Sequence, residues 1–341
     1  MRRVANGVLP RPVAGEDAGA REVHGTELIG ELQRFAAGRA HGVPLPGHDA
    51  TRRRFAELAE VAARDLSLGR LVEGHLDALA ILSEADTKPV DSRATYGVWA
   101  ARSPRHVTEA ILTADGWHLW GEKAYCSGST RLDRALVTAE TPGGYRLFDI
   151  SIAESVIEAR SGSWAAVGMA DSISETLVFR SPPLAARFAI GPPGFYLERP
   201  GFWFGAIGVA ACWLGGARGL VERVGETLAP SASEAQLVEL GHAIAHVDAM
   251  TALLERAADA IDADPTDSSS TVRNRAMVTR HAIHHAVQQV LGHVAAAGGA
   301  GPLCHDAQQA RRAADLYVYL AQHHGPQDAA FLGRQALGGS A

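Results

Sequence analysis

The sequence has few cysteines, few aromatic residues and no large excess of charge. Its three cysteines, Cys126, Cys212 and Cys304, are an odd number and lie far apart, which excludes the closely spaced pairs of a structural zinc site and favours a reducing cytoplasm. The formal net charge of -6 gives no basic field that would attract nucleic acid or an anionic membrane surface. We therefore expect a cytoplasmic protein without either partner.

Neither a secretory signal nor a membrane span is predicted. Residues 1–20 carry two arginines, followed by prolines and acidic residues where a signal needs an apolar core. Residues 200–217 form an uncharged run that just reaches membrane-spanning length. Because this run is rich in glycine and is bounded by Glu198, Arg199 and Arg218, we predict a helix buried between protein neighbours.

The rest of the composition is typical of a globular chain. Its 341 residues, 47% of them hydrophobic, can form two or three domains with substantial cores. Apolar residues recur at intervals of three and four, which predicts amphipathic helices over residues 51–82, 203–228, 233–262, 268–297 and 304–322.

The segment between these helical regions has a different pattern. From about Thr95, short apolar runs are separated by the turn signals ADG, TPGG and SPP, which predicts antiparallel strands. We expect an α+β, mostly helical fold in three parts: an N-terminal helical domain (1–94), a middle antiparallel β domain (95–190) and a C-terminal four-helix bundle (191–341).

Residues 116–137, GWHLWGEKAYCSGSTRLDRALV, contain the most informative motif. Gly121, Lys123, Tyr125, Cys126 and Ser127 fill the places of a G-x-K-x-W-[IV]-[TS] strand, so the segment resembles the middle-domain signature of the acyl-CoA dehydrogenase superfamily. The resemblance implies bound FAD, with Tyr125 packing on the ring system, Cys126 beside it and the Ser127 hydroxyl bonded near flavin N5. Read without the family, the segment is an ordinary strand followed by a turn.

Two further segments, residues 163–179 and 193–224, resemble the later middle-domain strands and the first bundle helix of the same superfamily. Near the C-terminus, GGAGP resembles a segment that borders the FAD of a neighbouring subunit. That resemblance implies cofactor contacts by Gly298, Gly299 and Gly301, and a homodimer or homotetramer. Such glycines also serve simply to end a helix.

The sequence departs from the family at two binding motifs. TYGVWAARSP, residues 95–104, replaces the usual E-P-x-A-G-S-D stretch, and the arginine motif that anchors the FAD pyrophosphate is missing. Other groups, such as a helix N-terminus or another arginine, would then hold the phosphates.

A catalytic base is needed if the chain introduces an α,β double bond into an acyl thioester, linked to CoA or to a carrier protein, with FAD as hydride acceptor. The last predicted helix offers no carboxylate, but Leu197-Glu198-Arg199 resembles the base-bearing sequence of isovaleryl- and long-chain-specific relatives. This resemblance makes Glu198 the base, and a solvated acid at a helix N-terminus is the alternative. The acyl chain and the electron acceptor are left open.

The histidines support a competing hypothesis. His75, His323 and His324 lie near positions where flavin monooxygenases of the same fold place active-site histidines, so a monooxygenase or oxidase acting on another small molecule is the alternative function. A non-catalytic paralogue is the third. The pairs His242/His246 and His281/His285 have metal-ligand spacing, but the sequence offers no third ligand, and no metal site is predicted.

Overall fold

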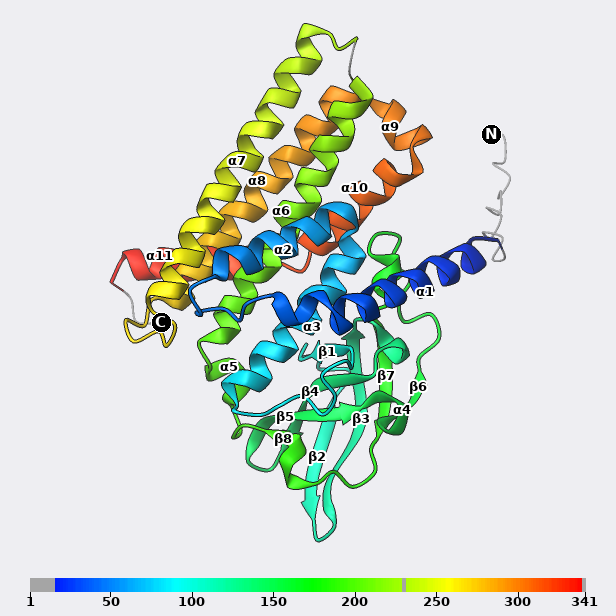
Figure 1. The fold of residues 1–341 in the computed structure, drawn as a ribbon, viewed down its shortest axis with the longest axis vertical. Helices are drawn as coiled ribbons and strands as arrows, with labels where there is room; N and C mark the ends of the chain where they lie inside the picture. Colours follow the sequence, from blue (N-terminus) through cyan, green and yellow to red (C-terminus); the bar gives the residue numbers. More distant parts are fainter. Residues whose placement is uncertain (1–15, 229–230, 339–341) are drawn as a thin grey trace, which may run out of the picture.

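The computed structural model describes residues 16–228 and 231–338 (Figure 1), without the side chains of residues 16–25, 39 and 41. Residues 1–15, which make up most of the segment on which the expectation of no export rests, lie outside the described part. A mixed β-sheet occupies one end of the molecule, a bundle of long helices occupies the other, and two N-terminal helices cross between them.

The N-terminal part is helical, with α1 (Glu16–Ala37), a short 3-10 turn, α2 (Thr51–Arg64) and α3 (Leu66–Glu84). The Asp65 carboxylate caps α3 by accepting a hydrogen bond from the Leu68 N–H at 2.8 Å. Helix α2 packs closely on the first bundle helix, where a Cβ on Gly215 would lie 2.2 Å from the Ala59 carbonyl oxygen. Only glycine permits that approach of two helix backbones.

The sheet comprises β1 (Tyr96–Trp99), β2 (Thr108–Thr113), β3 (Gly116–Cys126), β4 (Arg134–Thr141), β5 (Gly144–Ser151), β6 (Val156–Ala159), β7 (Glu175–Arg180) and β8 (Ala189–Ile190). The strand order is β6-β7-β3-β2-β4-β5-β8, with β1 beside β4. Most pairs are antiparallel, and the ADG and TPGG signals are the hairpin turns of β2–β3 and β4–β5. Strands β1 and β2 instead pair with β4 in parallel, which the turn signals could not indicate because these partners are not consecutive.

The C-terminal part is a helical bundle formed by α5 (Phe195–Glu198), α6 (Gly201–Leu228), α7 (Glu234–Ala263), α8 (Val272–Gly298), α9 (Ala300–His305), α10 (Ala307–Leu320) and α11 (Gly325–Ala336). The predicted α+β, mostly helical class with a C-terminal bundle is therefore confirmed. The last predicted helix is divided at Asp306, whose carboxylate caps α10 by accepting from the Gln308 and Gln309 N–H groups at 3.1 Å. Helix α11 was not predicted.

Two bundle helices, α6 and α7, are long and apolar enough to cross a membrane. In the most apolar 18-residue stretch of α6, 78% is buried inside the protein, as expected for a core helix. In α7 the buried share is 17%, and Leu237, Val238 and Ile244 are about half exposed. The outer face of α7 therefore presents apolar surface to its surroundings.

The sheet lies against both the bundle and α3. The loop before β7 lies directly on α10, where a Cβ on Gly168 would lie 2.0 Å from the Ala314 carbonyl oxygen and the Met169 N–H donates to the Asp315 carboxylate. On the opposite side of the junction, the Tyr96 N–H of β1 donates to Nδ1 of His75 on α3 at 3.2 Å. The strands begin at Tyr96 and end at Ile190, while the domain boundaries at residues 94 and 190 stay predictions.

Candidate active site

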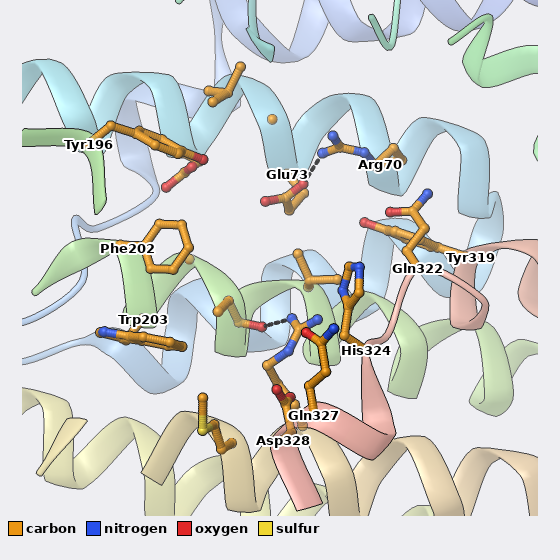
Figure 2. Close-up of a pocket in the computed structure, with 18 residues that line it drawn as sticks. Arg70, Glu73, Tyr196, Phe202, Trp203, Tyr319, Gln322, His324, Gln327 and Asp328 are labelled. Carbon is orange, nitrogen blue, oxygen red and sulfur yellow. Dashed lines mark hydrogen bonds and ion pairs between the residues drawn. The ribbon is translucent and has the colours of Figure 1, made fainter. Parts of the chain in front are cut away.

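A cavity of about 500 Å³ lies where α3, α6, α8 and the chain from α10 to α11 meet (Figure 2). It also reaches β1 through Val98. The labelled side chains around it are Arg70, Glu73, Tyr196, Phe202, Trp203, Tyr319, Gln322, His324, Gln327 and Asp328.

One wall of this cavity is charged and comes from α3. Arg70, Glu73 and Asp77 follow one another at spacings of three and four, which places them on one face of the helix. Arg70 and Glu73 form a largely buried ion pair (Figure 2). Burial raises the pKa of the Glu73 carboxyl, although the Arg70 charge opposes the shift. Asp77 faces the buried Arg199 at 3.5 Å.

The facing wall is aromatic and apolar. Phe202 and Trp203 project from the start of α6, and Tyr196 from α5 packs edge-on against Phe202 with ring centroids 5.5 Å apart. Val209 and Met277 extend this surface toward α8. A ligand held here would meet apolar surface on one side and charged groups on the other.

The C-terminal end of the cavity is formed by hydrogen-bonding groups. His324, Gln327 and Asp328 approach from the turn and helix after α10 (Figure 2). Tyr319 is fully buried, and its hydroxyl lies beside the Cys212 thiol without a partner at hydrogen-bond distance among the described residues. Burial raises the pKa of Tyr319 well above its usual value, so the hydroxyl keeps its proton and can donate to a ligand.

The arginine Arg280 closes the α8 side. Its guanidinium lies over the Trp213 ring, 4.8 Å from the centroid, and donates to the Ala206 carbonyl oxygen. Burial lowers its pKa, although an arginine so shifted remains charged at neutral pH.

The predicted flavin strand ends in an arrangement that suits a planar ring with a polar edge. Tyr125 is 60% exposed, whereas Ser127, two residues later, is buried. The Ser127 Oγ lies 2.9 Å from Ser174 Oγ, which lies 3.0 Å from Ser172 Oγ. An exposed aromatic side chain close in sequence to a hydroxyl is the combination that the family resemblance implies for the apolar face and polar edge of an isoalloxazine.

This strand is joined to the cavity wall. The Trp99 indole N–H donates to the Ser127 carbonyl oxygen at 3.0 Å, and the neighbouring Val98 lines the cavity. Cys126 is fully buried at an irregularity of β3, and its thiol donates to the Lys123 carbonyl oxygen at 3.3 Å, so the thiol is not presented to a flavin on the surface. Only its backbone is available for the predicted contact.

The structure does not bring Glu198 together with the histidines. Glu198 is exposed at the end of α5 and lines a separate cavity of about 350 Å³ with Arg102, Tyr145 and Arg146. Tyr196 borders both cavities. A catalytic base is expected in an apolar, enclosed position, but the Glu198 carboxylate is exposed.

The predicted histidines have different surroundings. His324 lines the 500 Å³ cavity, whereas His75 is 1% exposed and its Nδ1 is used by the Tyr96 N–H. His75 therefore links α3 to β1, and the cavity is lined instead by its neighbours Glu73 and Gly74.

The predicted glycines lie at the far end of the bundle. Gly298 ends α8, Gly299 turns the chain with a φ of 64°, and Gly301 lies in α9. Gly299 lines a further cavity of about 310 Å³ with Leu303 and Tyr317. Within the described residues, none of the three glycines lines the cavity that holds His324.

Most residues of this cavity were not predicted from the sequence, among them the charged or polar Arg70, Glu73, Asp77, Tyr319 and Asp328. The first three had a visible signal, since ionisable residues at spacings of three and four in an otherwise apolar helix form a charged stripe on a buried face. Tyr319 and Asp328 had none, because the cavity that they face is formed by packing between distant segments.

Comparisons with known proteins support the fold described above. No protein-family model matches the chain, and no curated protein matches it. Among solved structures it is similar to the dibenzothiophene monooxygenase TdsC from Paenibacillus sp. A11-2, at 20% identity and a TM-score of 0.72 over 94% of this chain and 97% of that one. Another TdsC structure contains FMN and indole.

Two further structures show the same likeness. KijD3, bound to FMN and a dTDP-linked amino keto sugar, has 18% identity and a TM-score of 0.72, covering 96% of each chain. The methanesulfinate monooxygenase MsuC from Pseudomonas fluorescens has 18% identity and a TM-score of 0.70, covering 96% of this chain and 97% of that one. The chain therefore has the fold of these structures, which is the acyl-CoA dehydrogenase-like fold that the resemblance implied.

Proposed function

We propose that this protein is a flavin-dependent monooxygenase that acts on a small, polar, ring-shaped molecule. The observation that carries the proposal is the charged α3 wall of the cavity, formed by Arg70, Glu73 and Asp77. The acyl chain of a thioester needs an apolar channel, whereas this wall presents an ion pair and a carboxylate to the cavity. A ring with hydrogen-bonding groups on its edge suits both the charged wall and the aromatic wall opposite.

The structural neighbours support the monooxygenase alternative over acyl thioester dehydrogenation. TdsC and MsuC are described as monooxygenases, and the ligands named for TdsC and KijD3 are small molecules rather than thioesters. The position of Glu198 outside the cavity points the same way, because dehydrogenation needs a base at the substrate. The resemblance to the acyl-CoA dehydrogenases then concerns the fold and the flavin rather than the substrate.

We further propose FMN as the flavin. FAD needs a group that holds its pyrophosphate, and the family's arginine motif for that purpose is missing from the sequence. The flavin named in the TdsC and KijD3 structures is FMN. Bound flavin would supply two electrons to molecular oxygen, one atom of which enters the substrate.

The residues of this chain then have distinct roles. Tyr125 offers its ring face and Ser127 its hydroxyl to the flavin. At the C-terminal end of the cavity, Tyr319 donates a hydrogen bond to the ligand and His324 delivers a proton. The α3 wall binds the polar edge of the substrate, and the aromatic wall formed by Tyr196, Phe202 and Trp203 packs against its flat face. A cytoplasmic location, expected from the cysteine content, stays a prediction.

The test begins with flavin binding, measured by quenching of flavin fluorescence with FMN and with FAD. A flavin reductase and NADH then supply reduced flavin, and oxygen uptake and hydrogen peroxide release are followed with a panel of sugars, amino sugars and aromatic heterocycles. Oxygen uptake with a hydroxylated or oxygenated product supports the proposal. Anaerobic reduction of bound flavin by an acyl thioester would overturn it, and a protein without flavin affinity would support the non-catalytic paralogue.

A further inference from the structure

Four histidines gather beside the cavity, and none of them has a role in the function proposed above. His281, His284 and His285 lie on α8, and His323 lies in the turn after α10. Ring centroids are 4.6 Å apart for His285–His281 and His284–His323, and 5.8 Å apart for His281–His323 and His284–His285. We call this group the histidine cluster.

Buried polar atoms without partners concentrate here. Six of the buried polar atoms that lack a partner within hydrogen-bond distance in the described part of the chain lie at this place: Nδ1 of His281, Nδ1 of His284, both ring nitrogens of His323, Nε1 of Trp213 and the hydroxyl of Tyr319. The Trp213 ring lies 5.8–6.3 Å from His323, His284 and Tyr319, so the six atoms share one region. Buried polar groups in folded proteins are almost always satisfied, and ordered water is the ordinary way to satisfy a cluster of them.

A metal ion does not suit this cluster as it is arranged. Among the described residues, no three His, Cys, Asp or Glu side chains converge on a point that a metal could occupy. The contacting rings are tilted at 44° to 89° to one another instead of directing nitrogens at a common centre. Water, which accepts and donates in several directions, fits better.

The two ends of the histidine cluster lie in different surroundings. His285 is exposed on the surface of α8. At the other end the His323 side chain is fully buried, and its Nδ1 lies 3.7 Å from the Asp328 carboxylate. Asp328 lines the cavity, as do Tyr319 and His324 (Figure 2). The cluster therefore spans the distance from the protein surface to the wall of the active-site cavity.

We propose that the histidine cluster, with water held between its rings, forms a proton path from the surface at His285 through His284 and His323 to Asp328 in the cavity. The proposal rests on the proposed monooxygenase function, which requires a proton. A singly anionic reduced flavin, one proton, O2 and the substrate give oxidised flavin, the oxygenated substrate and one water. The flavin and the proton together supply both hydrogens of that water, and the proton must come from solvent.

The surroundings of the path favour the neutral form of two of its histidines, His323 and His284. Burial, together with the positive charge of Arg280 and neighbouring histidines, lowers the pKa of His323 to about 4 and also lowers that of His284. The other groups facing this region are Asp328 on α11, Tyr319 on α10 and the Arg70–Glu73 pair on α3. A neutral imidazole has one donor and one acceptor nitrogen, so it can take a proton on one side while giving one up on the other.

The first test does not need flavin. A crystal structure of the wild-type protein at a resolution that defines water should show water within hydrogen-bond distance of His323 Nε2, His284 Nδ1 and the Tyr319 hydroxyl. A dry cluster, or one in which these atoms are bonded directly to other side chains, would overturn the path regardless of what the protein catalyses.

The second test measures proton delivery. His284→Gln keeps a polar side chain of similar length but cannot pass a proton between two ring nitrogens. When reduced FMN and a substrate that the wild type oxygenates are supplied, this substitution should lower kcat by about 100-fold and leave KM nearly unchanged. That loss is the lower end of what proton-transfer groups contribute. Imidazole added to the buffer should restore part of the rate, and the exposed His48→Gln should match the wild type.

A wild-type rate in His284→Gln would contradict the proposal. So would a loss that imidazole does not restore and that follows a fall in thermal stability, since that is the behaviour of a structural residue. If no substrate is oxygenated even by the wild type, the proposed function has failed, and the water structure alone decides whether the path is there.

Discussion

Arg70 and Glu73 form an ion pair on the wall of the active-site cavity, one helical turn apart on α3 and largely shielded from solvent. Removing one member of such a pair leaves an uncompensated buried charge. We expect Glu73→Gln to lower the free energy of unfolding by about 3 kcal/mol, measured by urea denaturation. The matched double variant Arg70→Met/Glu73→Leu should recover most of that loss and still fail to bind substrate. A double variant with normal substrate KM would show that the charged wall does not bind the substrate.

The carboxyl of Asp315, where the sheet meets α10, predicts a dependence of stability on pH. Burial raises its pKa to about 6, although the Met169 N–H and Arg311 oppose the shift. The folded state therefore favours the protonated acid, so the resulting stability is fully present below about pH 4 and is lost as the pH rises through 6.

Asp315→Asn can still accept the bond from the Met169 N–H but never ionises. Relative to the wild type, it should gain up to about 3 kcal/mol of unfolding free energy between pH 4 and pH 7.5. Parallel denaturation curves at the two pH values measure this gain. A constant difference between variant and wild type would show that Asp315 ionises normally in the folded protein.

More of the fold than of the site could be predicted from the sequence. Periodicity predicted the long helices because each buries one continuous face, and that face repeats along the chain. The cavity is assembled from α3, α6, α8 and α11, which are not consecutive in the chain, and no local pattern records how they pack. Glu198 illustrates the difference: its neighbours resemble a family motif, but the short α5 ends before Pro200 and leaves the carboxylate outside the cavity that holds His324.

The Ser127 hydroxyl provides a test of flavin binding. If it donates to the flavin, Ser127→Ala removes one hydrogen bond and should weaken FMN binding by about fivefold, since such a bond contributes roughly 1 kcal/mol. Thr141→Ala, which removes a hydroxyl from the β4–β5 turn, is the control and should bind FMN normally. Fluorescence titration measures both affinities, and equal affinities in the two variants would remove Ser127 from the flavin site.

The roles of Glu198 and His324 separate the two candidate reactions. In a monooxygenase that uses the 500 Å³ cavity, His324→Ala should reduce oxygenated product by 100-fold or more and increase hydrogen peroxide release, because reduced oxygen is then no longer directed to the substrate. Glu198→Gln should leave both quantities nearly unchanged. The opposite result, with Glu198→Gln blocking flavin reduction by a thioester, would restore the dehydrogenase.

The exposed apolar face of α7 predicts self-association. Leu237 and Ile244 lie seven residues apart, hence on one side of the helix, and each is about half exposed. Gln236 Nε2 donates to the Ala297 carbonyl oxygen at 2.9 Å, so this end of α7 lies beside the segment with Gly298, Gly299 and Gly301. Pairing of two copies through α7 would therefore present that glycine segment to the partner, as its resemblance to a segment bordering a neighbour's flavin implies.

We expect Leu237→Glu/Ile244→Glu to convert a homodimer or homotetramer into smaller species, because the substitutions place charges where apolar surface would be buried. Sedimentation velocity measures the change. Leu112→Glu, which places the same charge on an exposed apolar position of β2, is the control and should leave the assembly intact. If the glycine segment completes the partner's site, the α7 variant should also lose FMN affinity while the control keeps it. A wild-type protein that is monomeric and fully saturated with FMN would contradict both the interface and the shared site.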